Sequence, residues 1–157
     1  MASYFTWTKA WNNIIRYVLF QDEELKSLMQ LPQNTNIIDF IDKYFIRGIT
    51  SSQILTNETV RVIYGNINTN GTASPSVTNN VLSFEIYVKN EEMHNVSNDR
   101  LEMRTEAISN RLTYLLTRNE YVKSTGYKFK VFNQSDMFTS TVGYSRYNVA
   151  FTYMKTV

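Results

Sequence analysis

The spacing of apolar residues changes near Gly48, and that change limits the folds that this chain can adopt. Before Gly48, apolar side chains recur every three or four residues, which is the period of an amphipathic helix. After Gly48 most of them alternate with polar side chains, which is the period of a half-buried strand. The spacing therefore predicts an α+β fold whose helical N-terminal part spans residues 6–47.

Three helical segments are expected in the N-terminal part. Thr6 or Thr8 is a suitable N-cap for the first, whose apolar stripe consists of Trp7, Trp11, Ile14, Ile15, Val18 and Leu19. Asp22 begins a second segment that Pro32 ends, and a break near Gln21 would make these two parts of one helix. The third follows Asn34, Thr35 and Asn36 and places one apolar face on Ile37, Ile38, Ile41, Tyr44 and Phe45.

The rest of the chain predicts strands around one central helix. Strands are expected at 60–64, ending at Gly65, at 81–89, at 127–131 and at 147–153, with a turn at 133–135 and the first two strands antiparallel partners. Ser97 or Asn98 is a suitable cap for a helix that runs to about Arg118, with Leu101, Ile108, Leu112 and Leu115 along one stripe. We expect a mostly antiparallel sheet of four to five strands, packed by the N-terminal helices and this central helix.

Length and composition predict one domain and exclude several classes of function. The chain has 157 residues, which predicts a single domain over 1–157, with the sheet and central helix in residues 53–157. It has no cysteine, which excludes disulfides, thiolate nucleophiles and cysteine-ligated zinc. Lys and Arg number 16 against 14 acidic residues, and a net charge of +2 is too small to indicate nucleic-acid binding. The first 19 residues have no signal-peptide pattern, and no membrane span is expected.

No catalytic constellation is visible in the sequence. His94 is the only histidine, and it lies in a polar linker without partner ligands nearby in sequence. The acidic residues at 22–24 are explained by helix capping and by the helix dipole. Glu85 and Lys89 share one face of a strand but lack the second carboxylate that a metal nuclease needs. We therefore predict no enzyme activity, no metal and no cofactor.

Two basic patterns have two interpretations each. Lys128 and Lys130 alternate with Tyr127 and Phe129, which suits either a nucleic-acid-stacking strand or an ordinary half-buried strand. A row of arginines along the central helix could face DNA or an acidic partner, but interspersed glutamates favour a solvated or subunit-facing surface. The row is Arg100, Arg104 and Arg111.

Between the first two strands lies an uncharged stretch, 66–80, built almost entirely of Asn, Thr, Ser, Gly and Ala. Such a stretch has too few apolar groups to fix itself and is predicted to be a mobile loop. Two functions remain open for it: docking to a partner, or a surface hairpin loop with no further task.

Taken in order, the predicted elements resemble the tail terminator and related neck or tail-completion proteins of long-tailed bacteriophages. The features that carry this resemblance are the helix with Ile14, Ile15, Val18 and Leu19, the strand 60–64 that opens into a long polar loop, the strand 81–89, the helix NDRLEMRTEAISNRL at 98–112 and the closing strand RYNVAFTYM at 146–154. The predicted helix at 36–47 makes the N-terminal part longer than in the simplest members.

The resemblance implies a structural virion protein located at the neck, and in the host cytoplasm during assembly. Subunits would form a homo-oligomeric ring, commonly a hexamer, that terminates the tail tube, contacts the tail tube protein and an adjacent neck or connector protein, and lets DNA pass through its lumen without sequence recognition. The alternatives are another neck protein, of the head-completion or connector kind, or a non-structural phage accessory protein that binds nucleic acid.

The resemblance also assigns candidate contact residues. Docking to a partner would involve the polar loop, through Asn66, Ile67, Asn70, Pro75, Val77 and Asn79. The subunit interface would involve Arg100, Arg104, Arg111, Tyr87 and Tyr147. Tyr17 and Tyr114 are further aromatic residues suited to an interface.

Overall fold

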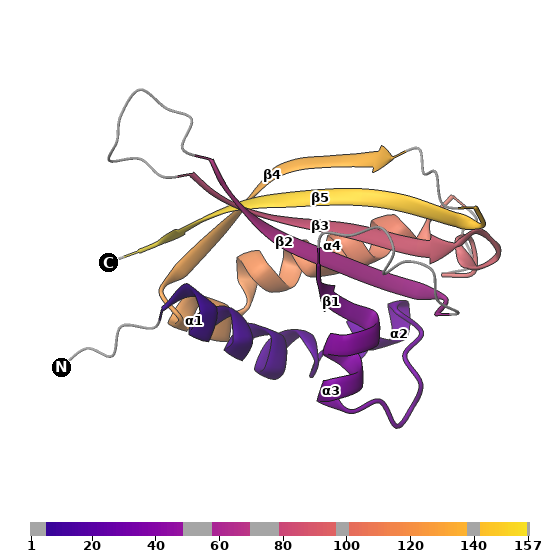
Figure 1. Ribbon diagram of the computed structural model, residues 1–157, viewed down its shortest axis with the longest axis horizontal. Coiled ribbons are helices and arrows are strands. Elements are labelled where there is room, and N and C mark those ends of the chain that lie inside the picture. The colour runs from indigo at the N-terminus through magenta and orange to yellow at the C-terminus, as the bar shows by residue number, and fades with distance from the viewer. Residues whose placement is uncertain (1–5, 49–57, 70–78, 97–100, 138–141, 157) are drawn as a thin grey trace.

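The chain folds as an α+β structure in which helices cover one face of a mixed sheet, as a computed structural model shows (Figure 1). The model describes residues 6–48, 58–69, 79–96, 101–137 and 142–156. These residues form a five-stranded sheet in the order β1-β2-β3-β5-β4. The strands are β1 (Phe45–Arg47), β2 (Val60–Thr69), β3 (Asn79–Lys89), β4 (Tyr127–Met137) and β5 (Tyr144–Lys155). Only the β1–β2 pair is parallel, so the expected α+β class with a mostly antiparallel sheet is confirmed.

The N-terminal helices begin at polar caps, two of which, Thr6 and Asp22, are among those that the sequence predicts. The Thr6 side chain accepts a hydrogen bond from the Lys9 amide at the start of α1 (Trp7–Ile14), which continues as a π-helical turn, η1 (Ile15–Leu19). Asp22 caps α2 (Glu23–Leu28), and Asn36 caps α3 (Ile37–Asp39), which continues as a second π-helical turn, η2 (Phe40–Tyr44). Each cap satisfies an amide that has no partner inside its helix.

The later helices flank the second half of the sheet. A short 3-10 turn, η4 (Asn90–Glu92), follows β3, and α4 (Arg104–Arg118) packs against β3, β4 and β5. After it comes α5 (Glu120–Ser124), capped by Asn119. In the part of the chain that the structure describes, no helix is both long and apolar enough to cross a bilayer.

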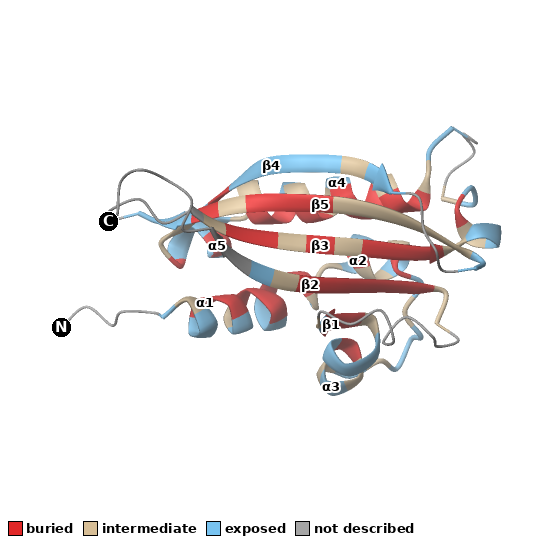
Figure 2. Cartoon of the chain, turned by 45° about the horizontal axis from the view of Figure 1, so that its top comes forward, coloured by how far each residue is buried: buried red, intermediate tan, exposed pale blue. Residues whose placement is uncertain are grey.

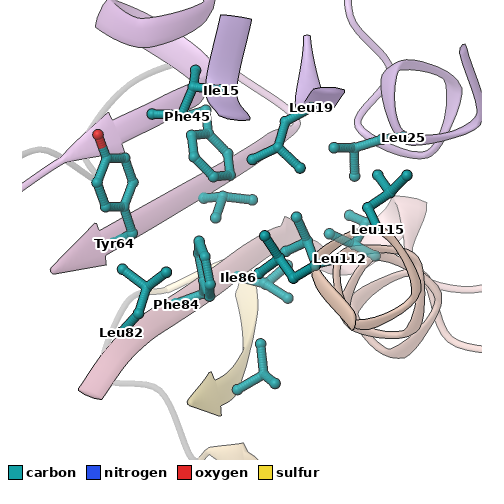
Figure 3. Close-up of a cluster of buried hydrophobic side chains, with 14 of the residues drawn as sticks. Ile15, Leu19, Leu25, Phe45, Tyr64, Leu82, Phe84, Ile86, Leu112 and Leu115 are labelled. Atoms are coloured by element: carbon teal, nitrogen blue, oxygen red, sulfur yellow. The ribbon is translucent and has the colours of Figure 1, made fainter. Parts of the chain in front are cut away.

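The core lies between the sheet and the helices, where side chains from both layers point toward each other (Figure 3). Alternate residues of β2, β3 and β5 supply the sheet half, as their period of two requires. Trp7 stacks on Tyr153 with ring centroids 3.7 Å apart, and Trp11 packs edge-on against Tyr64. These aromatic contacts bind α1 to strands from both halves of the sheet.

The opposite face of the sheet is also partly buried. Ile63, Tyr87 and Tyr144 form a small apolar cluster there. Arg61 lies on the same face, donates from Nε to the Lys43 carbonyl at 2.9 Å, and pairs with Glu58 at 3.2 Å. This face of the sheet is therefore partly covered by other residues and is not fully exposed to solvent.

Several element boundaries differ from the sequence predictions. Phe45 lies in β1 and not in a helix, because this short strand pairs with β2. Strand β2 continues past Gly65 to Thr69, because it pairs with β3 as far as Asn79. This pairing uses backbone hydrogen bonds and does not require apolar side chains. Strand β4 crosses the expected 133–135 turn through an irregularity between Val131 and Asn133. Helix α4 begins later than predicted, at Arg104, and Leu101 before it is exposed. The predicted caps Ser97 and Asn98 lie outside the described residues.

Candidate interaction surfaces

The first candidate surface is β4, the last strand in the sheet order. Among the described strands it pairs with β5 alone, so its other side is a sheet edge. Most of its length from Lys130 is exposed (Figure 2). The exposed part of β4 includes two apolar residues, Val131 and Phe132, and the Phe132 side chain is 66% exposed. An exposed, apolar sheet edge is a template for pairing with another chain.

The irregularity in β4 explains why Phe132 is exposed. Val131 is paired with Phe151 and Asn133 with the next residue along, Ala150, so Phe132 is the extra residue between them. A residue left out of the ladder in this way is unpaired and bends its strand. The sequence contained a signal for it, since the adjacent apolar residues Val131 and Phe132 break the alternation of the strand.

The second candidate surface is a groove of about 570 Å³ near β1, at the other end of the sheet order. One wall comes from α1 and η1, the other from α3 and η2, and the remaining side from β1 and Tyr64. Four isoleucines give it an apolar lining, Ile15, Ile37, Ile41 and Ile46. Both π-helical turns contribute to its walls, and such turns are frequent at functional sites.

Charged groups surround this groove. Arg16 and Arg47 line it and are exposed, and so is Asp42. Burial raises the pKa of Tyr64, while Trp11 and the positive charge of Arg47 act in the opposite direction. The groove therefore combines an apolar lining with two cationic groups and one anionic group. Its lining residues come from separate helices and strands, so no local pattern in the sequence indicates it.

Two residues predicted for a subunit interface are inside the fold. Arg104 is 4% exposed, and its guanidinium donates to the carbonyls of Glu92 at 2.9 Å and of Leu28 at 2.8 Å. Tyr87 is 2% exposed, and its hydroxyl donates to Glu85 at 2.8 Å. Their burial contradicts a role at an exposed interface. Burial and the hydrogen bond to Glu85 raise the pKa of Tyr87 to about 12.

The other predicted interface residues lie nearer the surface. Arg111 pairs with Asp22 at 2.7 Å and with Glu24 at 2.9 Å, so its charge is used within the chain. Tyr147 is half-buried against the core, and burial together with Glu106 and Asp136 raises its pKa. Tyr17 and Tyr114 are both exposed, and Arg100 lies outside the described residues.

Three of the residues predicted for the docking loop lie in strands. Asn66 and Ile67 belong to β2 and Asn79 to β3, so these three residues are paired strand positions and not loop. The side-chain oxygen of Asn66 accepts from the Tyr153 hydroxyl at 3.3 Å. Asn70, Pro75 and Val77 lie outside the described residues.

The remaining sequence candidates are separated in space. His94 is exposed in the turn after η4, and within the described segments no three His, Asp or Glu side chains are grouped as a metal site. Lys128 and Lys130 are exposed, whereas Phe129 is buried and Tyr127 packs against the core. Because alternate residues of a strand point to opposite faces, the lysines do not share a face with these aromatic rings. This arrangement favours the half-buried strand over the stacking strand.

Comparisons with known proteins do not indicate a function for this chain. No protein-family model matches the chain, and a search of curated protein sequences finds no significant similarity.

Proposed function

We propose that the protein is a structural subunit of a tailed bacteriophage that assembles into a ring at the head–tail neck, terminates the tail tube and joins the tail to the head. The observation that carries this proposal is the exposed edge of β4 with its apolar residues Val131 and Phe132. A second copy that adds to such an edge would satisfy its backbone groups and cover its apolar side chains.

The order of elements supports the same proposal. A helical N-terminal part, a β2–β3 hairpin, one central helix and a closing pair of strands are the features that the resemblance to neck proteins rests on. A hexamer is the first choice of stoichiometry, with the tail tube and a neighbouring neck or connector protein as partners and DNA in the lumen. Another neck position remains the main alternative within this class.

The direct test is the mass of the purified protein over a range of concentrations, with negative-stain electron microscopy of the largest species. We expect concentration-dependent rings. Phe132→Lys should shift the protein toward monomer, because it removes the apolar side chain that a second copy would cover and places a charge in the contact. Leu101→Lys is the matched control, since Leu101 is 85% exposed and lies outside the sheet.

A protein that stays monomeric at every concentration and shows no ring by microscopy would contradict the proposal. So would rings that form equally well with Phe132→Lys, because the β4 edge would then have no part in assembly. The rival function, nucleic-acid binding by an accessory protein, predicts instead a salt-dependent affinity for DNA that is lost on replacing Lys128 and Lys130 with Gln.

A further inference from the structure

The sheet has two open ends. Among the described strands, β1 pairs with β2 alone and β4 pairs with β5 alone. Each end strand therefore has one side on which its backbone N–H and C=O groups are available to another strand. The strands β2, β3 and β5 lie between these two ends (Figure 1), so the ends of one chain do not meet. They can meet between two copies.

Backbone hydrogen bonds define which groups of β1 are directed outward. The Gly48 N–H donates to the Tyr64 carbonyl of β2 at 3.2 Å, and the Phe45 N–H donates to the Phe40 carbonyl of η2. Successive residues of a strand direct their backbone groups to opposite sides. Arg47, directly before Gly48, therefore directs its N–H and C=O away from β2. A strand that adds to this end of the sheet would form hydrogen bonds with the Arg47 backbone.

The strand directions of the two ends are compatible with pairing. Strand β1 is parallel to β2, and each further pair in the sheet is antiparallel, so β4 runs opposite to β1. In a ring of six copies, neighbouring subunits are related by a rotation of about 60°, which is too small to reverse the direction of a strand. The β4 strand of one copy therefore meets β1 of the next copy as an antiparallel neighbour.

A pair of β4 strands is the other way in which two copies could join. That contact would use the same surface on both copies and would end at a dimer, whereas a ring needs two different surfaces that meet head to tail. The β1 end of the sheet provides the second surface. The exposed residues Val131 and Phe132 on β4 add a favourable term, by about 25 cal/mol for each Å² of apolar surface removed from water.

We propose that β4 of one subunit pairs with β1 of the next subunit in an antiparallel arrangement, so that the sheets of all subunits form one continuous sheet around the ring. This inference rests on the proposed ring function and deepens it, because it names the part of the second copy that β4 contacts. The helix-covered face of each sheet continues as the helix-covered face of the next, since a rotation about the ring axis does not exchange the faces.

The first experiment compares Arg47→Pro with Arg47→Ala in the full-length protein. Proline has no N–H to donate and is tolerated on an edge strand whose N–H faces outward, so the single chain should still fold. Alanine removes the same side chain and keeps the N–H. We expect Arg47→Ala to form rings as the wild type does. Arg47→Pro should need about tenfold more protein for half-maximal assembly, because it loses a hydrogen bond of the contact. Mass measurement over a range of concentrations gives this value.

The second experiment uses cysteine pairs, for which the natural absence of cysteine gives a clean background. Arg47 lies on the helix-covered face, as Gln134 and Asp136 do, whereas Asn133 and Ser135 lie on the opposite face. Each residue is replaced by Cys in a separate protein, and each β4 variant is mixed with Arg47→Cys and oxidised mildly. We expect a disulfide with Gln134→Cys or Asp136→Cys. The matched controls Asn133→Cys and Ser135→Cys should cross-link much less.

The remaining outcomes overturn the inference. Arg47→Pro and Arg47→Ala that assemble equally well, or cross-linking that does not distinguish the two faces of β4, would do so and leave the proposed function standing if the wild type forms rings that Phe132→Lys prevents. Disulfides mainly between two copies of Gln134→Cys would indicate a pair of β4 strands instead. A wild-type protein that stays monomeric would overturn both proposals. Circular dichroism verifies the fold of each variant, and if Arg47→Pro does not fold, the cross-linking decides.

Discussion

Arg111 and Asp22 lie 89 residues apart in the chain and form a two-point ion pair, with Arg111 Nε 2.9 Å from Asp22 Oδ2 and Nη2 2.7 Å from Oδ1. Asp22 Oδ2 also accepts the Leu25 amide at 2.8 Å, so one carboxylate caps α2 and anchors α4. Two parallel hydrogen bonds between charged groups are stronger and more directional than a single one. This pair therefore joins the N-terminal helices to the central helix.

Asp22→Asn should lower stability most at neutral pH. Burial raises the pKa of Asp22, but the hydrogen bonds from Arg111 and Leu25 and nearby positive charges outweigh it, so the pKa lies below its ordinary value of 3.8. The charged form thus adds stability above about pH 4 that is lost as the pH falls through the folded-state pKa. At pH 7 we expect a loss of about 1–2 kcal/mol in the free energy of unfolding, measured by urea denaturation.

The pH dependence gives the control for that prediction. The difference between wild type and Asp22→Asn should shrink as the pH falls from 3.8 through the folded-state pKa of Asp22, because the carboxylate is then progressively protonated. Glu24→Gln should change stability little at pH 7, since the Glu24 carboxylate is mostly exposed. A loss that is the same at pH 7 and at pH 2 would show that the charge of Asp22 is not what stabilises the fold.

Arg104→Lys should destabilise the chain although it keeps the charge. The guanidinium donates to the backbone carbonyls of Glu92, Leu28 and Asn95, which come from three places in the chain. A lysine ammonium lacks the planar fork that reaches all three, and each carbonyl that loses its donor while shielded from water costs about 1–3 kcal/mol. Urea denaturation measures this loss. Arg118→Lys, at the exposed end of the same helix, should have no measurable effect.

Periodicity predicted much of the fold because the main elements have strong apolar patterns. The stripe from Trp7 to Leu19 and the alternation in 81–89 both correspond to elements of the structure. The three-residue strand β1 could not be found this way, because it is too short to show a period. The extension of β2 through Asn66 could not be found either, since it depends on backbone pairing with β3 and not on side-chain character.

The site residues were harder to predict than the elements. Arg104 lies four residues before Ile108, on the same side of α4 as the apolar stripe. This spacing indicates burial, whereas the charge of an arginine indicates exposure. Tyr87 lies on the strand face away from the main core, and Ile63 and Tyr144 bury it there. The groove depends on how η1, η2 and β1 pack together, which no local pattern in the sequence specifies.

Tyr153→Phe should make the protein less sensitive to alkaline pH. Burial and the neighbouring Tyr127 raise the pKa of Tyr153 to about 12, from an ordinary value of 10.0. The unfolded chain therefore ionises at this residue before the folded chain does, and stability falls between pH 10 and pH 12. Phenylalanine removes that contribution, so the fall in unfolding free energy from pH 9 to pH 11 should be smaller in the variant.

The matched control for this prediction is Tyr17→Phe. Tyr17 is more than half exposed, so its replacement measures the effect of removing a tyrosine hydroxyl at the surface. The variant Tyr87→Phe should behave like Tyr153→Phe, because the pKa of Tyr87 is also about 12. If Tyr153→Phe and the wild type lose stability equally between pH 9 and pH 11, the folded-state pKa of Tyr153 is not raised.

Replacing residues 70–78 by a two-residue Asn-Gly turn should preserve the fold and impair partner docking. Thr69 and Asn79 are directly paired at the end of the β2–β3 ladder, and a two-residue turn joins two such positions without changing the register. We expect the free energy of unfolding to stay within about 1 kcal/mol of the wild type, because shortening a loop changes its closure entropy only slightly. Rings should still form, since the β4 edge on which the proposed assembly rests is not altered. Under the proposed function, electron micrographs of phage assembled with the shortened protein should show tails that fail to reach normal length or to join heads. Normal virions would exclude a docking role for this segment, and an unfolded product would show that it packs against the core.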